Sequence, residues 1–114
     1  EKVAALENSV LKFDETHKKK PGYINIEEIL FRFEQKLYWT ESGKFAKTFQ
    51  DRFKKNLPFR SRGVHSANFY VLRRAKMPSI LLETGFISNS SNEEMLKKPA
   101  FRDKIVDSIA RGIS

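Results

Sequence analysis

Apolar residues recur at intervals of three or four along much of this chain, which is the spacing of one face of an α-helix. The first such stripe consists of Val3, Leu6, Val10 and Phe13. It predicts a helix over residues 2–13, and a polar connection over residues 14–24 follows it. Glu7 and Asn8 lie off the stripe, so the pattern predicts that they occupy a solvated helix face.

A second helix is predicted to begin at Asn25, because Glu28 follows three residues later as in a capping box. Its apolar stripe consists of Ile26, Ile29, Leu30, Phe33 and Leu37. Residues 40–43 break this pattern and predict the cap of a third helix, which continues to about residue 55. Its stripe consists of Phe45, Ala46, Phe49 and Phe53, which we expect in the core.

Two later segments have the composition of strands. Residues 69–73 are aromatic and β-branched, and Ile80-Leu81-Leu82 is an apolar run without alternation, typical of a strand buried on both faces. Glu83 ends that run and so lies at the C-terminal end of the predicted strand. Open α/β sheets bind their ligands at this end of their strands. By the pattern alone, Glu83 is better explained as an exposed strand end, because charged residues are usually exposed.

Two short helices complete the chain. Ser91 and Glu94 have capping-box spacing, and Pro99 separates this helix from the next. The last stripe consists of Phe101, Ile105, Val106, Ile109 and Ala110. Gly112 is predicted to be the C-terminal cap. Two strands alone are marginal, so we expect an α/β fold whose remaining strands are not in this sequence.

The composition describes a small basic globular chain. Its 114 residues are 39% hydrophobic and 32% charged, with a net charge of +8. The absence of cysteine excludes disulfides, thiolate metal ligands and a cysteine nucleophile. The positive charge favours polyanionic partners, which include nucleic acid, anionic lipid and anionic cell-wall polymers.

Three segments of the chain stand out together, and they are Gly63-Val64-His65-Ser66-Ala67-Asn68-Phe69-Tyr70-Val71-Leu72-Arg73, Met77-Pro78, and Leu82-Glu83-Thr84-Gly85-Phe86-Ile87-Ser88-Asn89. In this order and spacing, they resemble the zinc-dependent type 3 N-acetylmuramoyl-L-alanine amidases. Glu7-Asn8 and the closing helix are also similar. The resemblance covers nearly the whole chain but only the C-terminal part of the family domain. It implies an α/β fold with a mixed sheet flanked by helices, to which this chain supplies the C-terminal strands and helices.

The resemblance also implies roles for individual residues. Glu83 matches the catalytic glutamate, which takes a proton from zinc-bound water and can return it to the leaving amine. Arg73 is expected to bind a substrate carboxylate or orient Glu83, and a structural ion pair is an equal alternative. His65 is a weaker candidate for substrate contact. Zinc is the implied cofactor, but the family's ligand motifs do not occur here, so no residue is assigned to the metal.

The expected function is therefore hydrolysis of the bond between N-acetylmuramic acid and L-alanine in peptidoglycan, outside the cytoplasm. Residues 1–114 would form the C-terminal portion of one catalytic domain and would be inactive without the metal-binding portion. One alternative is a non-catalytic basic module that binds cell-wall glycan or nucleic acid. Another is a degenerate amidase that acts as a regulator. Nucleic acid is the less favoured partner, no transmembrane segment is expected, and the sequence does not indicate an oligomeric state.

Overall fold

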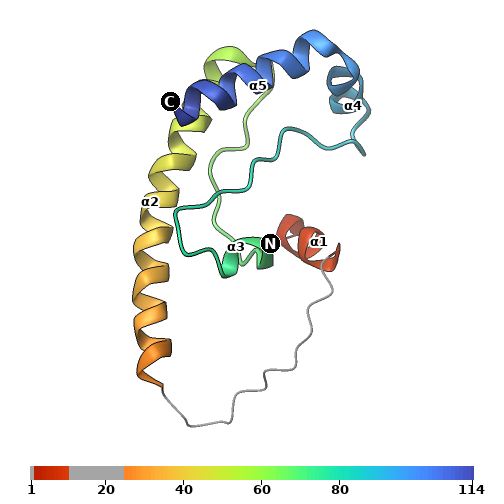
Figure 1. Ribbon diagram of the computed structural model, residues 1–114. Helices are drawn as coiled ribbons and strands as arrows, with labels where there is room; N and C mark the ends of the chain where they lie inside the picture. Colours follow the sequence, from red (N-terminus) through yellow and green to blue (C-terminus); the bar gives the residue numbers. More distant parts are fainter. Residues whose placement is uncertain (1, 11–24) are drawn as a thin grey trace. The chain divides into compact units, whose positions relative to one another are not determined.

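All regular secondary structure in the described part of the chain is helical. The computed structural model describes residues 2–10 and 25–114, and the predicted polar connection with His17 lies outside them. The elements are α1 (Lys2–Val10), α2 (Ile26–Asn56), α3 (Tyr70–Arg73), α4 (Ser90–Lys97) and α5 (Pro99–Ile113). Figure 1 shows long stretches without helix on either side of α3.

The expected α/β fold is wrong for the described residues, which contain helices but no strand and therefore no sheet. The predicted strand at residues 69–73 is largely helix α3. There the Leu72 amide donates to the Phe69 carbonyl at 3.1 Å, and the Ala75 amide donates to the Leu72 carbonyl at 3.2 Å. Residues 80–82 have no regular structure. The pattern describes side chains, whereas a strand also needs a neighbouring strand to pair its backbone groups.

Helix α2 replaces the two helices that the sequence predicts on either side of residues 40–43. Asn25 caps its start as expected, because its side-chain oxygen accepts from the Glu27 amide at 3.1 Å. Thr40 does not cap a new helix. Its hydroxyl donates to the Lys36 carbonyl at 3.1 Å, one turn earlier, which is compatible with an uninterrupted helix. The predicted end of this helix before Leu57 is confirmed.

The chain divides into two compact units, which we describe separately. The first unit contains Glu1–Ser42 and His65–Ser79, and the second contains Gly43–Val64 and Ile80–Ser114. Helix α2 contributes its first seventeen residues to the first unit and the remainder to the second.

The core of the second unit lies where α5 packs on the end of α2. Phe49, Phe101 and Ile105 are buried, as the stripes predict, and Phe59 meets Phe101 edge-to-face with ring centroids 4.8 Å apart. Val106 was expected in the same stripe but is 63% exposed. Gly112 is not a cap, because α5 continues to Ile113.

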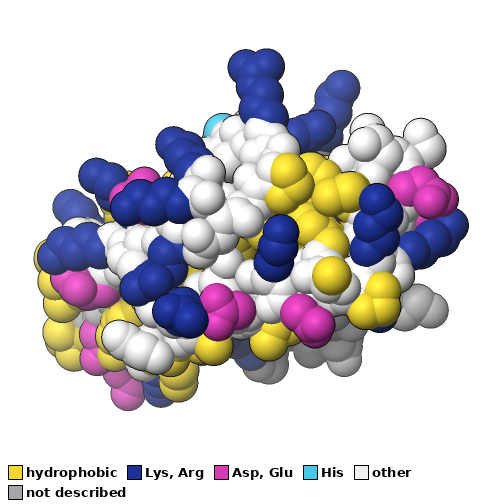
Figure 2. Space-filling view, turned by 90° about the horizontal axis from the view of Figure 1, so that it is seen from above, with side chains coloured by type: hydrophobic (Ala, Val, Ile, Leu, Met, Phe, Trp, Pro, Cys, Tyr) yellow, Lys and Arg dark blue, Asp and Glu magenta, His cyan; other side chains and the backbone are white. Residues whose placement is uncertain are grey.

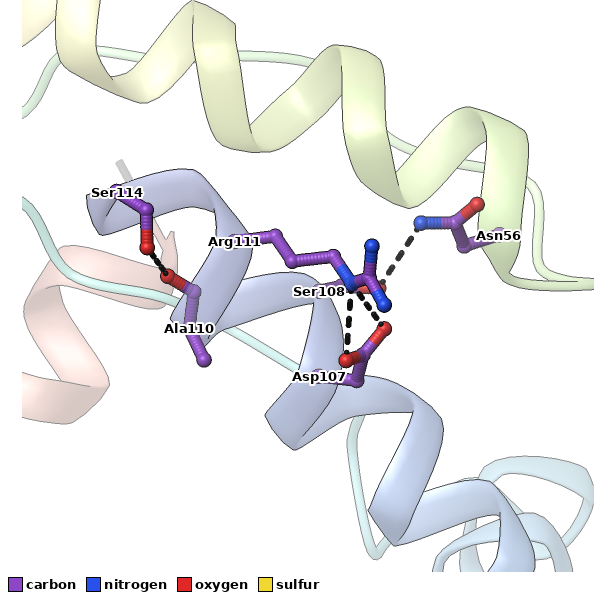
Figure 3. A network of polar contacts seen from close by, with 6 residues as sticks. All are labelled: Asn56, Asp107, Ser108, Ala110, Arg111 and Ser114. Carbon is purple, nitrogen blue, oxygen red and sulfur yellow. Dashed lines mark hydrogen bonds and ion pairs between the residues drawn. The ribbon is translucent and has the colours of Figure 1, made fainter.

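A polar contact accompanies this packing (Figure 3). Ser108 of α5 is only 1% exposed, and its hydroxyl accepts a hydrogen bond from the Asn56 side-chain amide at 3.3 Å. One residue earlier, Asp107 forms an exposed ion pair with Arg111 at 2.9 Å. This part-buried contact favours one register of α5 against α2, because an unpaired buried hydroxyl is unfavourable, whereas an exposed ion pair adds little.

The helices of the described residues are either too short or too polar to cross a lipid bilayer.

Candidate functional site

Glu83 lies in the second unit, in the irregular stretch between residue 79 and α4. Its side chain is exposed, whereas the adjacent Leu82 and Thr84 are half-buried. The neighbours therefore anchor the backbone, while Glu83 itself remains accessible to solvent. A carboxylate placed in this way can exchange a proton with water or with a bound substrate.

The residues after Glu83 form a turn with defined geometry. Gly85 has φ of +153°, a conformation that residues with a Cβ rarely adopt. The Phe86 amide donates to the side-chain oxygen of Asn92 at 3.1 Å, and the Asn89 amide donates to the Phe86 carbonyl at 3.0 Å. These contacts tie the segment after Glu83 to α4.

Asn89 caps α4, and this cap differs from the predicted one. The sequence predicts a capping box at Ser91 and Glu94, but α4 begins at Ser90. The Asn89 side-chain oxygen accepts from the Asn92 amide at 3.1 Å. Asn89 therefore acts as a hydrogen-bonding residue at the start of α4. Asn92, which the sequence pattern did not single out, supports both the cap and the turn.

A cation–π contact restrains the same turn from the other segment of the second unit. The guanidinium of Arg62 lies 5.1 Å from the ring centroid of Phe86. Phe86 is half-buried and Arg62 is exposed. The turn is therefore held by α4 on one side and by residue 62 on the other.

Arg73 lies in the first unit, at the end of α3, and its guanidinium is oriented by two neighbours. Its Nε and Nη2 atoms donate to the side-chain oxygen of Asn68 at 3.3 and 3.1 Å. Its guanidinium carbon is 4.6 Å from the ring centroid of Tyr70. Arg73 is nevertheless exposed. A guanidinium oriented by its neighbours and open to solvent can bind a carboxylate with its remaining donors.

Asn8 joins α1 to the group formed by Arg73, Asn68 and Tyr70, which we call the arginine cluster. Its side-chain amide donates to the Asn68 carbonyl at 2.8 Å, and its side-chain oxygen accepts from the Tyr70 amide at 2.9 Å. The prediction that Asn8 lies on a solvated face is therefore wrong, since the side chain is half-buried and bonded on both sides. A local pattern cannot reveal this role, because the partners are 60 and 62 residues away.

His65 opens the second segment of the first unit and is exposed. The next residue, Ser66, accepts a hydrogen bond from the Trp39 indole at 2.8 Å. This bond fixes the path of the chain beside His65 against α2. His65 and Arg73 thus belong to one unit and Glu83 to the other, and we assign each residue a role only within its own unit.

The described residues contain no cluster of three or more His, Cys, Asp or Glu side chains that could hold a metal ion. This part of the chain therefore does not fit a complete zinc site, which needs at least three protein ligands. We accordingly assign no metal ligand.

Comparison with known sequences links these residues to a family. A sequence model of the N-acetylmuramoyl-L-alanine amidase family, type 3, matches residues 15–114. The match includes Glu83, Arg73 and His65. No solved structure matches the chain.

Individual relatives cover much of this chain but little of their own length. N-acetylmuramoyl-L-alanine amidase LytC of Bacillus subtilis is 42% identical over 71 residues, which are 62% of this chain and 14% of that protein. N-acetylmuramoyl-L-alanine amidase AmiC of Escherichia coli O6:H1 is 35% identical over 94 residues, 82% of this chain and 22% of that protein. The germination-specific N-acetylmuramoyl-L-alanine amidase of Bacillus subtilis is 36% identical over 76 residues, 66% of this chain and 32% of that protein.

Proposed function

Because the chain belongs to the type 3 N-acetylmuramoyl-L-alanine amidase family, we propose that it forms part of a peptidoglycan hydrolase. The bond cleaved is the amide between N-acetylmuramic acid and the L-alanine of the stem peptide. The observation that carries this proposal is the family match over residues 15–114, which includes the exposed Glu83. The protein works outside the cytoplasm, where this substrate lies.

Glu83 acts as the general base and then as the general acid. Its carboxylate accepts a proton from the attacking water, whose oxygen bonds to the carbonyl carbon. The same group then donates that proton to the leaving nitrogen as the C–N bond breaks. The net reaction adds one water and releases a carboxylic acid and an amine. The fixed turn at Gly85 and Phe86 supports this role, because proton transfer requires a constant position of the carboxylate.

Arg73 and His65 contribute to substrate binding. The Arg73 guanidinium, oriented by Asn68 and Tyr70, has the geometry to bind a stem-peptide carboxylate. Zinc is part of the proposal as the family's cofactor. Its ligands would lie outside the described residues, so no step assigned to Glu83 is derived from it. The chain is then the C-terminal portion of one catalytic domain and inactive by itself.

The test compares Glu83→Gln with Glu94→Gln in the protein that contains this chain. Both glutamates are exposed in the second unit, so each change removes one negative charge from an exposed position. Free L-alanine amino groups released from purified peptidoglycan are measured with an amine-reactive dye. Glu83→Gln is expected to lower the rate by about 10²-fold or more, the usual contribution of general acid–base catalysis, and Glu94→Gln to leave it unchanged.

Hydrolysis by Glu83→Gln within about threefold of the parent rate would overturn the assigned role. A parent protein that binds peptidoglycan and releases no amino groups would instead favour the non-catalytic module or the regulatory amidase.

A further inference from the structure

The net charge of the second unit comes from only one of its two segments. Residues 43–64 contain seven Lys or Arg and one Asp, for a net charge of +6. The basic residues are Lys44, Lys47, Arg52, Lys54, Lys55, Arg60 and Arg62, and the acidic residue is Asp51. Residues 80–114 contain five basic and five acidic residues, so their net charge is zero. A general surplus of lysine would not produce this difference between segments of one compact unit.

Three of these lysines form a face of α2 opposite to its buried side. With 100° of rotation per residue, Lys47, Lys54 and Lys55 all lie on the side of the helix away from Phe49. Lys44 and the acidic Asp51 lie on the same side, so this side keeps a net positive charge. Phe49 is 2% exposed and packs towards α5, whereas the three lysines are exposed. We call these three residues the lysine face. Figure 2 shows many Lys and Arg side chains projecting from the molecular surface.

The positive charge continues into the loop after α2. Arg60 and Arg62 are exposed there, and the Phe86 contact restrains Arg62. In the neutral segment, by contrast, Lys97 forms ion pairs with Glu93 and Glu94 at 3.1 and 3.3 Å. The net positive charge of residues 43–64 therefore extends from the last turns of α2 into the following loop.

We propose that the lysine face and Arg60 bind a linear polyanion whose charges are phosphodiesters on a flexible, non-aromatic chain. Lysine ammonium groups act as mobile point charges, which suits a flexible polymer with repeated phosphates. We identify the source of these phosphodiesters as a polyol-phosphate polymer of the cell wall. This choice rests on the proposed function. Such binding would hold the hydrolase next to its substrate.

The aromatic residues of the same segment argue against single-stranded nucleic acid as the partner. Proteins that bind such strands usually present aromatic side chains on which the bases stack. Here Phe45, Phe49, Phe53 and Phe59 are all buried or half-buried. They pack against one another or against Phe101. The surface beside the lysines thus offers charge without a stacking platform.

The test measures binding of the chain to poly(glycerol phosphate) of defined length, as a function of salt. One variant carries Lys47→Gln, Lys54→Gln and Lys55→Gln, and the control carries Lys97→Gln, Lys98→Gln and Lys104→Gln. Both variants lose three positive charges from exposed positions, and circular dichroism checks that both keep their helix content. The first variant is expected to bind at least about tenfold more weakly at low salt. Its plot of log affinity against log salt should be shallower by about 2, while the control matches the parent chain.

Three results would overturn the proposal. They are equal loss of affinity in the control variant, no binding by the parent chain, and tighter binding of duplex or single-stranded DNA of matched charge. A hydrolysis assay on peptidoglycan stripped of phosphate polymers separates this inference from the proposed function. There the protein with the altered lysine face should cleave at the parent rate. Absence of cleavage by the parent would count against the amidase proposal alone, because polymer binding is measured separately.

Discussion

The ring of Phe49 lies against the backbone of Gly112, so that these two residues set how closely α5 approaches the end of α2. An ideal Cβ built on Gly112 would lie 2.5 Å from the Cε1 atom of Phe49, well inside van der Waals contact. Phe49 is 2% exposed, so its ring has little room to move away. Glycine is needed here for close packing rather than for an unusual backbone angle.

Gly112→Ala is therefore expected to destabilise the chain by about 1–3 kcal/mol, the usual cost of overpacking a core. Gly43→Ala is the matched control, because Gly43 also lies in a helix and a Cβ there would meet nothing within 4 Å. That change should stabilise the chain by about 0.5–1 kcal/mol through helix propensity. Urea unfolding monitored by circular dichroism measures both effects. Equal stability of the two variants would disprove the close contact.

Asn8→Ala should destabilise the first unit by about 1–3 kcal/mol, because it leaves the Tyr70 amide and the Asn68 carbonyl without their side-chain partner. Ser9→Ala is the control, since the Ser9 hydroxyl bonds only to the Leu6 carbonyl of its own helix among the contacts described. Hydrogen exchange at the Tyr70 amide is the most direct measurement. Exchange should accelerate in the Asn8 variant and stay unchanged in the Ser9 variant. Unchanged exchange in both would show that Asn8 does not hold α1 against α3.

Gly85→Ala should disturb the turn that follows Glu83. The new Cβ would lie 3.2 Å from the Asn92 side-chain oxygen and would impose a φ that alanine avoids, at a cost of about 1–3 kcal/mol. Asn92→Ala removes the acceptor of the Phe86 amide and should loosen the same turn without that backbone strain. If the turn positions Glu83, both variants should lower kcat more than they raise KM in peptidoglycan hydrolysis. Normal kcat in both would limit the role of the turn to stability.

The sequence predicted the elements whose evidence is local. Asn25 caps α2, the Phe49, Phe101 and Ile105 positions are buried, and α2 ends before Leu57. These features depend on side-chain periodicity and on cap chemistry, both of which can be read within one helix.

Some failures are local, such as the caps predicted at residues 40–43, at Ser91 and at Gly112. The others involve partners that lie far away in the sequence. Residues 69–73 and 80–82 have strand-like composition, but among the described residues no strand forms to pair with them. Asn8 has a side-chain role that depends on Asn68 and Tyr70, which no helical pattern indicates. The exposure of Glu83 follows from its charge, but the turn that fixes it depends on Asn92. Its catalytic role was inferred from family resemblance and stays a prediction.

The contacts that shape the turn after Glu83 have a consequence for folding. The bond from Phe86 to Asn92 spans six residues and the cap from Asn89 to Asn92 spans three, whereas the bonds of Asn8 span about sixty. Closing such short loops loses little chain entropy, so this turn can form as fast as the end of a helix forms. The arginine cluster must instead wait for two distant segments to meet. The contacts of this turn with α4 are thus local, and the Arg62 contact with Phe86 is added from a more distant segment, while the surroundings of Arg73 are completed only as the first unit assembles.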